Sequence, residues 1–171
     1  LAGKLDHATQ VAEEMLVVAR QAGQTDFLCR ALIRLANLAI FTQTLETAVA
    51  CLKEAVQTAS QENHLRELAE AEWWTAQLTQ HQYNLPAAKI HSSRALELAR
   101  QLEMPELVAS AQNSLGYACL LTGEFSAAIL QMEQAQNYYV ETGNRALEAD
   151  CLTAVGGALV FQGRAREAIG L

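Results

Sequence analysis

The chain has 171 residues, of which 51% are apolar and only two are proline, and its formal net charge is −7. Because the apolar excess is Ala and Leu rather than Val and Ile, the composition predicts a mostly helical protein with a sizeable core. An acidic chain with scattered Lys and Arg lacks the basic surface that nucleic acid requires, and no apolar run approaches the roughly 18 residues of a membrane-spanning helix. We therefore expect neither nucleic acid nor a membrane among its partners.

Helical periodicity and turn residues divide the chain into alternating helices. In chain order, the predicted helices cover residues 5–22, 26–41, 45–62, 66–81, 85–102, 106–121, 125–142, 146–161 and 165 onward. Glycines that favour a left-handed C′ position follow several of them, at Gly3, Gly23, Gly123, Gly143 and Gly163. Pro86 and Pro105 each fall in a first turn, where the missing N–H costs little. The predicted N-caps are Asp26, Asn84 and Asn144.

The same pattern recurs every 40 residues, without insertions. The clearest copies are QTLETAVACLKEA from Gln43, YNLPAAKIHSSRA from Tyr83 and GEFSAAILQMEQA from Gly123, with GKLDHATQVAEEM from Gly3 and GRAREAIGL from Gly163 as extensions. Two columns hold small residues in every copy, namely Ala31, Ala71, Ala111 and Cys151, and Ala36, Ala76, Gly116 and Gly156. Small residues at one position indicate close approach of two helices in each unit. The unit is therefore a helical hairpin that must stack on its neighbours to bury its apolar face.

These columns resemble the tetratricopeptide repeat (TPR) family. Leu115-Gly116, then Gly123, Phe125, Ala128 and Ala135 match that family's spacing of Leu-Gly, Gly, Tyr, Ala and Ala, and Leu35-Ala36, Gln43, Leu45, Ala48 and Ala55 form a second copy. The usual TPR unit has about 34 residues, so the longer unit here is similar to TPR arrays of bacterial signalling ATPases and regulators. The resemblance implies an all-α fold, a right-handed α-solenoid of stacked helix-turn-helix repeats.

The predicted domain organisation is a single array over residues 1–171. It comprises helix B of a truncated repeat over 1–25, the repeats 26–65, 66–105 and 106–145, and a partial repeat over 146–171. Neither end has the polar outer face of a capping repeat. We therefore expect a fragment of a longer protein, and its uncapped ends would also permit self-association.

In a TPR array, the first helix of each repeat (helix A; here 26–41, 66–81, 106–121 and 146–161) lines a concave groove, and the second (helix B) forms the convex side. The core face of helix A is predicted to carry the small columns with Leu32, Leu35, Leu115, Leu152 and Val155. The opposite face, which also carries Ile33 and Ser114, holds the candidate binding residues. These are Arg30, Arg34, Asn37, Trp73, Trp74, Gln77, His81, Asn113 and Tyr117.

Trp73 and Trp74 are the chain's two tryptophans, and this register directs both toward the groove. Amphipathic indole rings beside Gln and His suit a binding surface. The register has a weakness in this repeat, because Glu72 and Thr75 occupy core positions that are mostly Leu or Val elsewhere. A local rotation of the helix that buries one tryptophan in their place is the alternative interpretation.

The other candidates are weighed in the same way. Arg30 and Arg34 could clamp an acidic group of a partner, but Asp26 is also placed to pair with Arg30 along the helix. His81 could respond to pH, although a solvated residue near a helix end is the simpler interpretation. The ladder of Asn37, Gln77, Asn113 and Tyr117 could hydrogen-bond a peptide backbone or sugar hydroxyls.

Catalytic and metal-binding patterns are lacking in the sequence. There is no GxxxxGK[ST], no HExxH, and no Cys or Ser nucleophile with an apparent His partner. Cys29, Cys51, Cys119 and Cys151 have no metal-ligand spacing and suit small buried positions, which favours reduced thiols. With no signal-peptide pattern at the N-terminus, these features predict a cytoplasmic non-enzyme without metal or cofactor.

Three functional hypotheses remain. The first is an interaction module whose concave groove binds a peptide or helix of a protein partner. The second is a sensing arm of a larger bacterial signalling ATPase or transcription regulator, in which the aromatic residues would stack on a small-molecule ligand such as a sugar. The third is a spacer whose groove is unoccupied.

Overall fold

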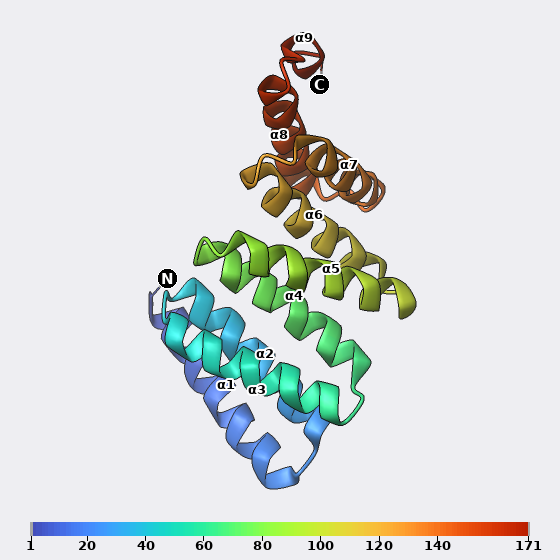
Figure 1. Ribbon diagram of the computed structural model, residues 1–171. Helices are drawn as coiled ribbons and strands as arrows, with labels where there is room; N and C mark the ends of the chain where they lie inside the picture. Colours follow the sequence, from blue (N-terminus) through green and yellow to red (C-terminus); the bar gives the residue numbers. More distant parts are fainter. Residues whose placement is uncertain (1, 171) are drawn as a thin grey trace.

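The computed structural model describes residues 2–170, and within them the chain is all-α (Figure 1). The helices are α1 (Ala2–Ala22), α2 (Thr25–Phe41), α3 (Leu45–Gln61), α4 (Leu65–His81), α5 (Leu85–Gln101), α6 (Pro105–Leu121), α7 (Phe125–Glu141), α8 (Arg145–Phe161) and α9 (Ala165–Ala168). No helix in this range is both long enough and apolar enough to cross a membrane. Leu1 and Leu171, the ends of the predicted array, lie outside the described residues.

The helices form an α-solenoid of helix-turn-helix units. Each helix packs on the next along the chain, and α2, α4, α6 and α8 also contact one another in sequence. The alternating helices α1, α3, α5 and α7 bring no Cα atoms within 8 Å of one another in the described range, and Arg20 of α1 pairs with Glu54 of α3 through side chains alone, at 2.9 Å. Figure 1 shows the units following one another from the N-terminal helices to α8 and α9. The helices of type A therefore form a continuous layer, and each helix of type B packs on the type A helices beside it in the chain.

The small-residue columns lie where helices meet. Ala31, Ala71, Ala111 and Cys151 are all fully buried. At Gly116 a Cβ atom would come within 2.9 Å of Met132 Cγ on α7, so a larger residue would displace that side chain. Burial of these columns between hairpin partners is the close approach that the repeat predicts.

Each connection between α1 and α9 contains one residue in the left-handed region. Gly23, Gly123, Gly143 and Gly163 occupy this position with φ of 65°, 79°, 69° and 76°, and the non-glycine residues there are Gln43, Asn63, Tyr83 and Glu103. Two turn predictions are wrong. Gly3 lies inside α1, and Asp26 lies inside α2, whose N-cap is Gln24. Asn84 and Asn144 are N-caps, and their side chains accept hydrogen bonds from Ala87 N and Leu147 N.

The predicted faces of helix A are partly wrong. Ile33 and Ser114, assigned to the groove, are 2% exposed, and Leu115 and Leu152, assigned to the core, are half-buried. The reason is that α2 packs on α4 and α4 packs on α6, so each neighbouring helix covers one flank of the face that was expected to be free.

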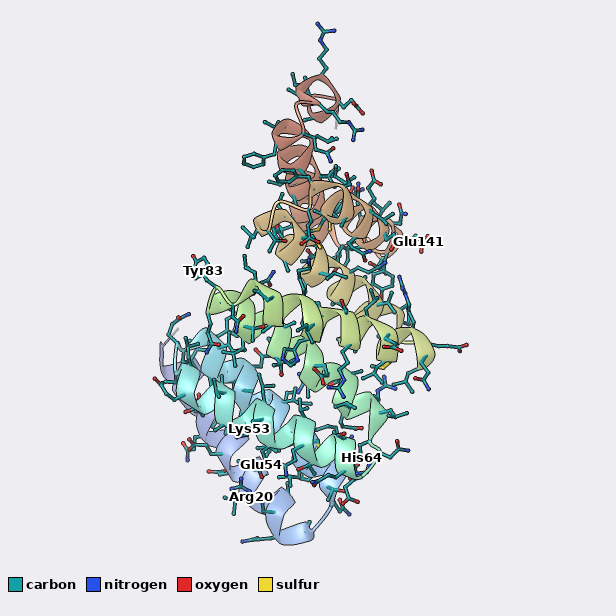
Figure 2. The ribbon with its side chains drawn as sticks, viewed as in Figure 1. Arg20, Lys53, Glu54, His64, Tyr83 and Glu141 are labelled. Carbon is teal, nitrogen blue, oxygen red and sulfur yellow. The ribbon has the colours of Figure 1, made fainter. Side chains whose placement is uncertain are left out.

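Replacement of Tyr83 tests how much a non-glycine residue in the left-handed region destabilises the fold. Its φ is 56°, and its side chain is 84% exposed and projects away from the turn between α4 and α5 (Figure 2). A left-handed conformation strains most L-residues, while Gly adopts it freely. We expect Tyr83→Gly to raise the free energy of unfolding by roughly 0.5–1 kcal/mol, measured by urea denaturation followed by circular dichroism. Asn63→Gly is the control and should gain less, because Asn tolerates this region. A destabilised Tyr83→Gly variant would contradict the strain argument.

Candidate binding groove

Both tryptophans line one hollow, here called the tryptophan groove. It has a volume of about 480 Å³ and lies among α2, α4, α6, α7 and the turn between α5 and α6. Its lining residues are Arg34, Arg66, Glu70, Trp73, Trp74, Leu102, Glu103, Met104, Pro105, Glu106, Leu107, Ser110 and Tyr138. The groove therefore combines aromatic, apolar and charged side chains from elements far apart in the sequence.

The two indoles lie at the boundary between groove and core. Their ring centroids are 4.6 Å apart, with the ring planes tilted by 57°, and both side chains are half-buried. Trp74 packs against the apolar cluster around α2 and α3, whereas Trp73 packs against the clusters formed with α5 and α6. Each ring thus has one side fixed by packing while part of it faces the groove.

Ser114 holds Trp73 in place. Its Oγ accepts hydrogen bonds from Trp73 Nε1 at 3.0 Å and from Gln77 Nε2 at 2.7 Å, and it donates to the carbonyl oxygen of Ser110 at 3.0 Å. Trp74 makes no side-chain hydrogen bond to any part of the chain that the structure describes. Trp73 is therefore an anchored indole, and Trp74 is the indole whose N–H stays available to a ligand.

Two guanidinium groups face the groove without a carboxylate partner. Neither Arg34 nor Arg66 has a carboxylate oxygen within 4.0 Å among the side chains that the structure describes. Burial raises the pKa of the Glu70 carboxyl, an effect that Arg34 and Arg66 partly offset. Arg30 is engaged elsewhere, since its Nη2 lies 2.6 Å from Asp26 Oδ2.

The other predicted site residues do not all gather in this groove. Gln77 is bound to Ser114, and His81 lines a separate hollow of about 260 Å³ with Tyr83 and Leu121. Tyr117 packs against the apolar cluster of α7 and α8, and burial, with the nearby Asp150 and Cys151, raises the pKa of its hydroxyl. The structure thus separates the predicted polar ladder into local groups.

Asn37 and Asn113, the remaining members of the ladder, are half-buried. The Oδ1 atom of each is buried without a hydrogen bond from the described residues. Neither is a lining residue of the tryptophan groove.

Several lining residues were not singled out from the sequence. Arg66 lies one turn before Glu70 on the same helix face, a spacing that could have identified it. Tyr138 comes from α7 and Met104 from the turn between α5 and α6, and the simple division into concave and convex helices leaves both out. Their position depends on the curvature of the array rather than on a local pattern.

Glu72 remains in the core despite its charge. It is fully buried, and its Oε2 lies 2.6 Å from His91 Nδ1 while its Oε1 lies 3.0 Å from Arg94 Nη1, both on α5. Ala71 and Ala76 stay buried beside it, so α4 keeps the register of the other helices. The sequence analysis missed His91 and Arg94 as the partners that accommodate this carboxylate.

The comparisons with known proteins bear on the fold. No family model matches the chain, and no curated protein matches its sequence significantly. Among solved structures it is similar to BtubC (BKLC) from P. vanneervenii, with a TM-score of 0.85, 18% identity, and coverage of 99% of this chain and 70% of that one.

Two further structures share the architecture. One is Rap protein complexed with Competence and Sporulation Factor, with a TM-score of 0.78, 20% identity, and coverage of 97% of this chain and 45% of Rap. The other is a putative kinesin light chain of P. anserina with TPR-like repeats, with a TM-score of 0.77, 14% identity, and coverage of 99% and 84%. The fold therefore defines the chain as a TPR-like α-solenoid.

Replacement of Ser114 tests the anchoring of Trp73. Ser114→Ala leaves the donors of Trp73 and Gln77 without their acceptor, and we expect a loss of roughly 1–2 kcal/mol in the free energy of unfolding. Tryptophan emission should shift as the indole loosens, with faster acrylamide quenching. Ser60→Ala, at an exposed helix position, is the matched control. Unchanged emission and stability in Ser114→Ala would contradict the anchoring role.

Proposed function

We propose that the chain is an interaction module that binds an acidic peptide segment of a partner protein in the tryptophan groove. In this proposal Trp73 and Trp74 contact an apolar side chain, while Arg34 and Arg66 bind a neighbouring carboxylate. The observation that carries it is the placement of two guanidinium groups without carboxylate partners beside a half-buried aromatic pair in one groove.

The chemistry of the groove supports a peptide ligand with these two features. Arg binds carboxylates through paired N–H donors, and aromatic residues and Arg are the side chains that most often carry binding energy at protein interfaces. Rap, an array of similar fold, was solved with Competence and Sporulation Factor. A neutral small molecule such as a sugar, the ligand expected for a sensing arm, offers the two arginines hydroxyl oxygens but no carboxylate for a charge-assisted pair.

Glu70 sets the electrostatic balance of the site. Its carboxylate shares the groove with Arg34 and Arg66 and competes with an incoming carboxylate for them. Because burial raises its pKa, the ionised form is disfavoured in the folded chain, and the stability that it costs is regained as the pH falls through that raised pKa. Glu70→Gln should therefore leave the fold stable and strengthen binding of an acidic peptide.

Selection from a randomised peptide library tests the proposed ligand. Peptides selected on the wild-type chain should be enriched in Asp or Glu next to a large apolar residue. The double variant Arg34→Glu/Arg66→Glu should weaken a selected peptide by about tenfold or more, equivalent to ~1.4 kcal/mol, in fluorescence-anisotropy titrations. Glu70→Gln should have the opposite effect.

The control is Arg100→Glu/Arg166→Glu, which changes the net charge equally at exposed arginines outside the tryptophan groove. Equal losses of peptide affinity in the two double variants would mean that long-range charge alone causes the effect. They would refute a direct contact between the two arginines and a carboxylate of the peptide. Selected peptides without acidic residues, or tighter binding of a neutral sugar at the same tryptophans, would also reject the proposal.

A further inference from the structure

A second hollow lies on the side of α4 opposite the type A neighbours, here called the outer groove. It has a volume of about 460 Å³. Its lining residues are Val49, Leu52, Lys53, Val56 and Gln57 of α3, Thr75, Leu78, Thr79 and Gln82 of α4, and His91 of α5. Because α3 and α5 bring no Cα atoms within 8 Å of each other in the described range, α4 forms the floor between them. Figure 2 labels Lys53 on α3, at one wall of this groove.

The outer groove coincides with a local departure from the repeat. At the position of Thr75 the other helices of type A carry Leu35, Leu115 and Val155. Threonine is shorter than leucine and leaves space above α4 that a larger apolar side chain would occupy. One turn earlier, Glu72 replaces the Leu32 of the first hairpin. Positions where a repeat gives up core packing are candidates for function.

The floor of the groove presents methyl groups rather than free donors. The hydroxyl of Thr75 donates to the Ala71 carbonyl at 2.7 Å, and that of Thr79 donates to the Thr75 carbonyl at 2.8 Å. These hydroxyl hydrogens are used within α4, so the methyl groups and Leu78 remain for an apolar ligand. Val49 and Val56 continue this surface on α3.

The polar groups at the walls favour an anion. Among the side chains that the structure describes, no carboxylate oxygen lies within 4.0 Å of the Lys53 ammonium, and no Asp or Glu is among the lining residues. His91 Nδ1 lies 2.6 Å from Oε2 of the buried Glu72, so this ring serves that carboxylate. The carboxylate of Glu72 lies in contact with His91 and Arg94. The outer groove is thus a largely apolar site whose lining carries the ammonium of Lys53 and no carboxylate, in a chain of net charge −7.

We propose that the outer groove binds a small aliphatic monocarboxylate. The chain of the ligand lies on Val49, Val56 and Leu78, and its carboxylate is bound by the ammonium group of Lys53. The volume of the groove falls in the range of small-molecule sites, and charge complementarity selects the head group. This site is separate from the tryptophan groove, so the two proposals stand independently.

Octanoate and octylamine form the test pair, because they share an alkyl chain and differ in charge. Titrations followed by ligand-observed NMR and calorimetry should show saturable binding of octanoate and at least tenfold weaker binding of octylamine. Lys53→Glu should weaken octanoate about tenfold or more, the equivalent of ~1.4 kcal/mol, whereas Arg166→Glu, the charge-matched control, should not.

Thr75→Leu provides a variant that is expected to fold, because leucine is the residue found there in two other hairpins. It should fill the groove and abolish octanoate binding without lowering the urea midpoint. Arg66→Gln, at an exposed position of the tryptophan groove, should leave octanoate binding unchanged and so separate the two sites. The proposal is overturned by octylamine binding as tightly as octanoate, by undiminished binding in Thr75→Leu, or by the lack of saturable binding.

Discussion

Close packing at small-residue positions is the constraint on which this structure depends. Ala71 and Ala111 are fully buried, and the Cβ position of Gly116 is already occupied by Met132. Larger residues there would force the hairpin helices apart, because interiors are packed to crystalline density. The close packing of α6 on α5 and α7 depends on these contacts, and α6 in turn contributes Ser110 to the tryptophan groove.

The α4 hairpin departs from the repeat, because polar side chains take part in its packing. On one side of α4, Ser114 binds the Trp73 indole and the Gln77 amide. On the other side, Glu72 is buried against His91 and Arg94. A buried carboxylate is retained only where partners compensate its desolvation, so this hairpin gives up apolar packing on both sides. Helix α4 is therefore the element in which the array differs most from a uniform scaffold.

The sequence was sufficient to predict the helices and the fold class. Helix periodicity and small columns are local or near-local signals, and the predicted starts of the type A helices differ from α2, α4, α6 and α8 by a single residue. The sequence analysis identified left-handed turn positions only at glycines, and Tyr83 and Glu103 adopt the same region without a composition signal that marks them.

The groove was predictable only in part. Arg34, Trp73 and Trp74 follow from helix-face spacing, and the structure places them in one groove. The inclusion of Tyr138 and the burial of Ile33 depend on how far each neighbouring helix covers a face, which a single-helix pattern does not encode. The partners of Glu72 lie on the following helix, so its compatibility with the core required the tertiary arrangement.

The central claim is that an acidic peptide contacts the tryptophan groove, and indole NMR tests it most directly. Trp73 and Trp74 are the only tryptophans in the chain, so two indole ¹H–¹⁵N signals report on this groove alone. Titration with a selected acidic peptide should shift the Trp74 signal saturably, with a smaller shift for Trp73, whose N–H is held by Ser114. Peptide binding measured by anisotropy while both indole signals stay in place would contradict the account.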